Sequence, residues 1–152
     1  MRASRHRLGR HLHKVGLAVL LAPLALLSEQ ASAQTSSVWD GIYTEAQAQR
    51  GRRLYLRECK ECHGEKLRGG ETAPGLIGKE LVSFWSEASV GALFESIRET
   101  MPEENPSGLS DRVYADILAY LFQANKFPLG EEELDENVER LWRISISPEP
   151  PE

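Results

Sequence analysis

Residues 56–67 read Leu-Arg-Glu-Cys-Lys-Glu-Cys-His-Gly-Glu-Lys-Leu, and they hold both cysteines of the 152-residue chain. Cys59 and Cys62 are three positions apart, and His63 directly follows the second cysteine. Two thiols at this spacing occur in disulfide switches, in zinc sites, where they supply half of the ligands, and at covalent attachment points for haem. The rest of the sequence distinguishes among these three kinds of site.

The first 33 residues have the order of a secretory signal peptide. Five basic residues come before an apolar run from Val15 to Leu27, and Ala31-Ser32-Ala33 then supplies the small residues of a cleavage site. We expect residues 1–33 to be a cleaved leader, so that the protein is exported to the periplasm without stable insertion in the membrane. A retained membrane anchor is the alternative, but the apolar run is short for a bilayer, which needs about 20 apolar residues.

Loss of this leader changes the charge balance. The whole chain has 18 basic and 23 acidic residues. The leader holds five of the basic residues and one of the acidic residues, so residues 34–152 have 13 basic and 22 acidic residues and a net charge of −9. Nucleic acid is therefore a poor partner, because no excess of basic side chains is present to bind phosphates. The negative charge either steers the protein to a basic surface on another protein or keeps it dissolved, and the sequence leaves both open.

Helical patterns dominate residues 34–130. A capping box at Thr44 and Gln47 starts a helix that runs to about Arg57 or into the cysteine segment. Two more amphipathic helices follow a glycine-rich loop. We expect one all-α domain here, followed by an acidic and partly disordered C-terminal extension at residues 131–152.

The ligand count favours haem over the other two kinds of site. A structural zinc needs four ligands, and after loss of the leader His63 is the one histidine beside two cysteines. A thioredoxin-type dithiol expects a βαβ setting, whereas a helix and a glycine-rich loop flank this motif. In c-type haem attachment, the two cysteines bind two vinyl groups on one edge of the porphyrin, and the histidine binds the iron. The motif therefore predicts one haem c, attached through Cys59 and Cys62, with His63 on its iron.

A haem iron in an electron carrier needs a sixth ligand. Residues 34–152 contain one methionine, Met101, and no second histidine or third cysteine. Met101 is the candidate by elimination, and the alternative is that it fills core space, as methionines commonly do. A pair of His63 and Met101 raises the reduction potential compared with a pair of histidines. It also closes both axial positions, which favours electron transfer over binding of oxygen or peroxide. We therefore expect an electron-transfer protein without catalytic residues.

These motifs resemble those of the class I c-type cytochromes. Four segments stand in the order of that family: Cys59 to His63, Ala73-Pro74-Gly75-Leu76, Thr100-Met101-Pro102 and Leu118-Ala119-Tyr120-Leu121. The resemblance implies the cytochrome c fold, in which three to five helices wrap around one covalently bound haem and the N- and C-terminal helices cross.

In that family the crossing passes through a glycine and an aromatic residue of the first helix. Gly51 and Tyr55 precede Cys59 at the matching offsets, and Ile117 and Tyr120 match on the last helix. A missing Cβ at Gly51 would let the two backbones come close.

The resemblance also implies further haem contacts. The Pro74 carbonyl would accept the Nδ1 proton of His63 and fix the ring, a role that is compatible with Pro74 stiffening its loop. Trp85 would contact a haem propionate through its indole N–H, or it is a plain core tryptophan. Four apolar side chains would either wall the haem or pack the core: Leu76, Leu93, Phe94 and Ile97.

Further segments resemble small bacterial monohaem cytochromes that often accompany quinone-dependent (PQQ-type) dehydrogenases. They are Val38-Trp39-Asp40-Gly41, Tyr43-Thr44, Trp85 and Asn125-Lys126-Phe127-Pro128. This likeness implies a monomer that carries single electrons from a periplasmic dehydrogenase to a terminal oxidase or another cytochrome. The alternatives are a permanent cytochrome subunit of such a dehydrogenase complex, and a haem enzyme or gas sensor with a labile sixth ligand.

Overall fold

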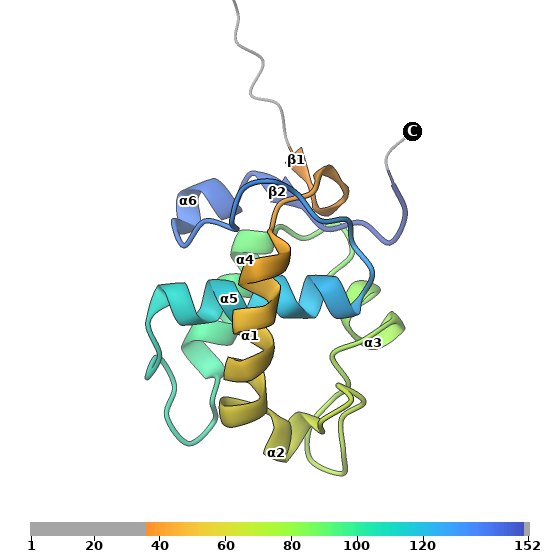
Figure 1. The fold of residues 1–152 in the computed structure, drawn as a ribbon. Coiled ribbons are helices and arrows are strands. Elements are labelled where there is room, and N and C mark those ends of the chain that lie inside the picture. Colours follow the sequence, from red (N-terminus) through yellow and green to blue (C-terminus); the bar gives the residue numbers. More distant parts are fainter. Residues whose placement is uncertain (1–35, 151–152) are drawn as a thin grey trace, which may run out of the picture. The chain divides into compact units, whose positions relative to one another are not determined.

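The computed structural model of the protein describes residues 36–150, so the expected leader at residues 1–33 lies outside the described part. Its elements in chain order are β1 (Ser36–Ser37), the 3-10 helix η1 (Val38–Asp40), α1 (Glu45–Glu58), α2 (Lys60–His63), α3 (Lys79–Val82), α4 (Val90–Thr100), α5 (Asp111–Ala124), α6 (Val138–Leu141) and β2 (Ile144–Ser145) (Figure 1). The sequence predicted three to five helices. Within residues 36–150 the single-turn helices bring the number of α-helices to six.

The three long helices start at residues that satisfy their free backbone N–H groups. The hydroxyls of Thr44, Ser89 and Ser110 accept hydrogen bonds from the third residue after each of them. At its other end, α4 stops before Met101, whose backbone is extended. Pro102 explains this ending, because a proline disfavours the helical conformation of the residue before it.

Helices α1 and α5 cross in direct contact (Figure 1). Gly51 makes the approach possible, because a Cβ at this position would overlap the carbonyl oxygen of Asp116. Next to this contact, the rings of Tyr55 and Tyr120 lie 5.4 Å apart. The predicted crossing through a glycine and an aromatic residue is confirmed.

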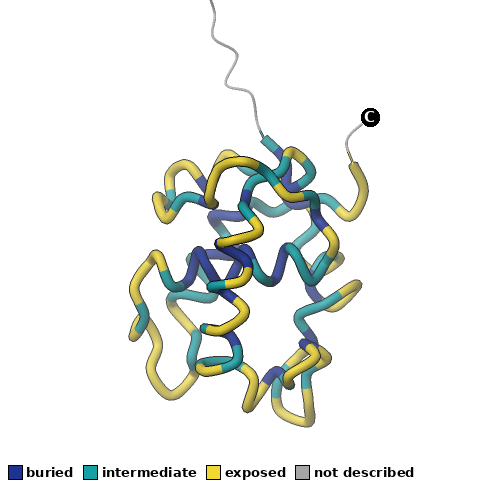
Figure 2. Tube along the Cα trace, viewed as in Figure 1, coloured by how far each residue is buried: buried dark blue, intermediate teal, exposed yellow. Residues whose placement is uncertain are grey.

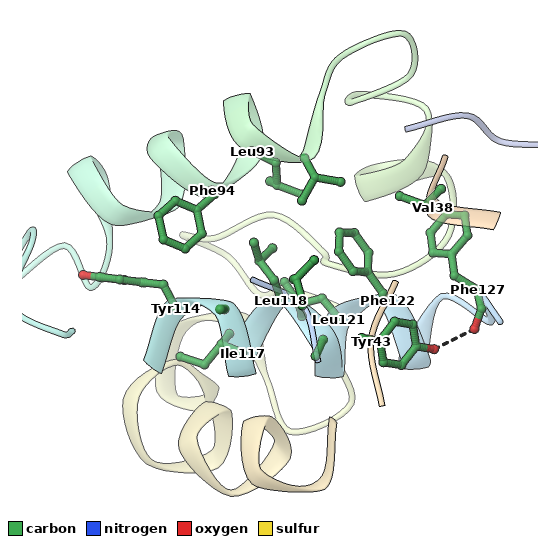
Figure 3. Close-up of a cluster of buried hydrophobic side chains, with 14 of the residues drawn as sticks. Val38, Tyr43, Leu93, Phe94, Tyr114, Ile117, Leu118, Leu121, Phe122 and Phe127 are labelled. Carbon is green, nitrogen blue, oxygen red and sulfur yellow. Dashed lines mark hydrogen bonds between the residues drawn. The ribbon is translucent and has the colours of Figure 1, made fainter. Parts of the chain in front are cut away.

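The hydrophobic core lies along α5, whose buried residues form the dark stretch in the centre of Figure 2. Figure 3 shows Leu93 and Phe94 of α4 on one side of Leu118 in α5. Both α4 and α1 therefore pack on α5, and this packing fixes the position of their ends relative to α5.

Residues 131–150 pack against the same core. Leu134, Leu141 and Ile146 are each less than 5% exposed, and β2 pairs in parallel with β1. The sequence predicted a partly disordered extension here. These buried apolar residues are spread among acidic ones, so the composition of this segment does not indicate how they pack. The division of the chain at residues 33 and 130 stays a prediction.

No helix within residues 36–150 has both the length and the apolar character that a membrane span requires.

Candidate haem site

A cavity of about 590 Å³ brings the sequence-predicted site residues together. Six of its lining residues are those expected to contact haem: Cys59, Cys62, His63, Pro74, Trp85 and Met101. Protein interiors keep few voids larger than a water molecule. A cavity of this size, lined by several leucine and isoleucine side chains, is therefore suited to a large and mostly apolar ligand.

The two cysteines reach the cavity from the end of α1 and from α2. Neither is in a disulfide; Cys59 is half-buried and Cys62 is exposed. Burial, with a smaller effect of the Glu58 carboxylate, raises the pKa of the Cys59 thiol to about 11. Cys59 is therefore a protonated thiol at neutral pH, and both sulfur atoms are available to bind a ligand.

His63 is buried at the end of α2, with 8% of its surface exposed. Its Nδ1 lies 2.9 Å from the carbonyl oxygen of Pro74. A carbonyl can only accept a hydrogen bond, so Nδ1 carries a proton, and in the neutral ring Nε2 then has the lone pair. The hydrogen bond that the family resemblance implied is present, and it leaves one ring nitrogen of His63 for a metal ion.

Met101 lines the cavity at the end of α4. Its extended backbone, with φ of −127° and ψ of 148°, takes the chain out of the helix. The structure thus brings Met101 to the same cavity as His63, although 37 intervening residues separate them in the sequence.

Trp85 lines the cavity as a half-buried side chain. Within residues 36–150 its indole N–H makes no hydrogen bond, so this donor is available to a ligand. Leu76, Leu93 and Ile97 also line the cavity. Phe94 does not; its ring packs on that of Tyr114, 6.3 Å away.

Sequence reasoning missed the charged and aromatic residues around the cavity. Five glutamates line it: Glu58, Glu61, Glu80, Glu103 and Glu104. We call this set the acidic rim; one arginine, Arg57, lies among them. Phe84 lies on the same lining and is 78% exposed. These residues come from four segments, so no local pattern in the sequence could have indicated that they meet.

The comparison with protein families gives a match over the haem-site residues. Residues 46–121 match the family model described as cytochrome C oxidase, cbb3-type, subunit III. The match spans half of the chain and includes the cysteines, His63, Met101 and most of α1 and α5. The comparison with curated proteins finds no match.

Among solved structures, the crystal structure of the sulfane dehydrogenase SoxCD from Paracoccus pantotrophus is similar to this chain, with a TM-score of 0.48 and 20% sequence identity. The similarity covers 88% of this chain and 68% of that one.

The family match and the mostly helical architecture confirm the predicted all-α cytochrome c fold. Members of this family carry a covalently attached haem c. The residues present fit such a group: two free thiols, a histidine with one available ring nitrogen, and a largely apolar cavity. The chain belongs to the class I c-type cytochromes, electron-transfer haem proteins, in the family described by subunit III of the cbb3-type oxidase.

Proposed function

We propose that this protein carries single electrons in the periplasm, from a dehydrogenase to a terminal oxidase or another cytochrome. The observation that supports this function is the placement of Cys59, Cys62, His63 and Met101 around one cavity. Two thiols that could tether a haem and two side chains that could bind its iron suit an outer-sphere electron carrier.

In this proposal, Cys59 and Cys62 would hold a haem c through thioether bonds, and His63 and Met101 would bind its iron. The haem, when bound, supplies a one-electron couple. The Pro74 carbonyl holds the His63 ring in one orientation and raises the basicity of Nε2. The thioether of Met101 would be the second protein donor to the iron, and would thereby keep oxygen and peroxide from binding there. Apolar lining residues such as Leu93 keep water away, which raises the reduction potential.

The acidic rim indicates the chemistry of a redox partner. Four of its members, Glu61, Glu80, Glu103 and Glu104, are exposed, and Cys62 is exposed beside them. We propose that a basic patch on the partner docks here, at the haem edge, through a small and transient contact. Charges of this kind speed the encounter more than they strengthen the complex.

Stopped-flow reduction of the haem-loaded protein by a PQQ-type dehydrogenase tests this function. We expect the rate to fall steeply between about 20 and 200 mM salt, because ions screen charges over about 10 Å at 0.1 M. A triple variant, Glu61→Gln, Glu103→Gln and Glu104→Gln, is expected to slow reduction at low salt and flatten the salt dependence.

A matched control removes three charges elsewhere: Glu131→Gln, Glu132→Gln and Glu139→Gln, all exposed and outside the cavity lining. This control is expected to keep most of the salt dependence. Equal effects of the two triple variants would show that the net charge matters rather than the acidic rim. Failure of every dehydrogenase to reduce the wild-type protein would contradict the proposed donor.

The second candidate function is a permanent cytochrome subunit of a dehydrogenase complex. Phe84 favours it, because a large apolar side chain that is 78% exposed at the cavity suits a lasting apolar interface better than a transient one. Gel filtration of the native protein at high salt separates the two functions. Co-elution with a dehydrogenase supports the subunit, and elution at the monomer position supports the mobile carrier.

A further inference from the structure

Three of the four tyrosines are buried, and each uses its hydroxyl in the same way. The hydroxyls of Tyr43, Tyr55 and Tyr114 each donate a hydrogen bond to a backbone carbonyl, over 2.6 to 2.7 Å, and each side chain is at most 1% exposed. The carbonyl acceptors belong to Phe127, Gly64 and Met101 in that order. Only Tyr114 therefore contacts the backbone of the candidate sixth ligand.

The backbone of Met101 has few other attachments. Its N–H donates to the carbonyl of Ile97 as the last bond of α4, whereas its own carbonyl lies beyond the helix. The loop that follows is held by bonds from Asn105 to Pro102 and from Ser107 to Arg98, and its residues 103–108 are exposed. Within residues 36–150, the hydroxyl of Tyr114 is the group that ties the Met101 carbonyl to the core.

Tyr114 is itself firmly placed. It lies near the start of α5, which Ser110 caps, and its ring meets that of Phe94 in α4 edge to face at 6.3 Å. Its hydroxyl therefore links the C-terminal end of α4 to the N-terminal end of α5, at the residue where the chain turns toward the cavity.

We propose that Tyr114 is a positioning residue for the sixth ligand: its hydrogen bond to the Met101 carbonyl holds the thioether where it binds the iron. This inference rests on the proposed ligation by Met101. A thioether is a weak neutral donor, so it competes with external ligands only if its backbone keeps it in place. Without the hydroxyl, the Met101 carbonyl loses its partner in the core, and the exposed loop can carry the sulfur away.

Titration of the ferric haem-loaded protein with imidazole tests this inference. The wild type, Tyr114→Phe and Tyr43→Phe are compared, since both variants remove one buried hydroxyl from one carbonyl and keep the ring packing. We expect Tyr114→Phe to bind imidazole about tenfold more tightly than the wild type, which corresponds to about 1.4 kcal/mol. Its weak charge-transfer band between methionine and ferric iron is also expected to shift or lose intensity.

In urea, Tyr43→Phe is expected to lower the free energy of unfolding by about as much as Tyr114→Phe does. It is expected to bind imidazole with wild-type affinity, because Tyr43 is outside the cavity lining. Wild-type affinity in Tyr114→Phe, or an equal gain in both variants, would overturn the positioning role. A wild-type protein without the charge-transfer band would instead overturn ligation by Met101, and this outcome needs neither variant.

Discussion

His63 presents a single nitrogen to the cavity because its other ring nitrogen is engaged by the Pro74 carbonyl. The residues around it add to this constraint: the His63 carbonyl accepts a bond from the N–H of Gly69, and the next carbonyl, of Gly64, accepts one from Tyr55. The imidazole is therefore fixed before any metal binds, which would lower the cost of ordering it at a haem iron.

Replacement of both cysteines by serine tests covalent attachment. We expect the Cys59→Ser/Cys62→Ser protein to carry no haem through denaturing electrophoresis, because a hydroxyl does not form the thioether bond. Each single variant keeps one thiol and is expected to retain part of the haem signal. A double variant that still stains for haem in the denaturing gel would refute attachment at these residues.

At the scale of helices, the site depends on the crossing of α1 and α5. Helix α1 ends at Glu58, directly before the two cysteines, and α5 supplies Ile117 and Leu121 to the cavity. The contact at Gly51 sets how closely the two helices approach, so it also sets the position of the cysteines relative to α5.

Gly51→Ala is expected to destabilise the protein by about 3 kcal/mol, because overpacking a tight contact forces the backbones apart. The free energy of unfolding in urea measures this. Gly70→Ala is the control: its Cβ would lie 3.5 Å from the Cys62 carbonyl oxygen, an ordinary contact, so a change within about 0.5 kcal/mol is expected. Equal stability of Gly51→Ala and the wild type would show that the helices are free to separate.

At the scale of the whole described domain, Arg50 joins three parts of the chain. From α1 it donates two hydrogen bonds to Asp116 of α5, at 3.1 and 2.9 Å, and two to Glu133, both at 2.8 Å. Arg112 of α5 also reaches Glu133, at 3.1 Å. The acidic C-terminal segment is thereby fastened to the two crossing helices.

Acid is expected to weaken this attachment. The hydrogen bond from Arg50 holds the pKa of Glu133 below its ordinary value, so the stabilisation is present above the unfolded pKa of about 4.3. The stabilisation is lost as the pH falls through the lower pKa that Glu133 has in the folded protein.

Glu133→Gln should therefore lower the free energy of unfolding at pH 7, by only about 0.5 kcal/mol because solvent screens this partly exposed group. Its stability should also fall less than that of the wild type in acid. Urea unfolding from pH 7 to 3 measures both effects. Glu132→Gln, at an exposed neighbour, should show the same dependence of stability on pH as the wild type. The same dependence of the free energy of unfolding on pH in all three proteins would contradict the role of Glu133.

Features that depend on local sequence were predictable, and those that depend on contacts between distant segments were less so. The motif from Cys59 to His63 was predictable because its residues are neighbours in the sequence. The crossing at Gly51 joins two helices, and it was the family resemblance that indicated it. Met101 could be singled out because elimination needs no geometry. The link from Tyr114 to Met101 and the acidic rim arise only when separate segments meet, and no periodicity records them. Similarly, the packing of Leu141 was masked by the acidic residues around it.

We propose that His63 and Met101 both bind the iron of one haem, which would make the protein an electron carrier rather than a haem enzyme or gas sensor. The most direct measurement is the absorption spectrum of the ferric wild-type protein at neutral pH. We expect the weak charge-transfer band between methionine and iron, its loss in Met101→Ala, and binding of carbon monoxide by the reduced variant. A wild-type spectrum without this band, or a reduced wild type that binds carbon monoxide readily, would contradict the claim.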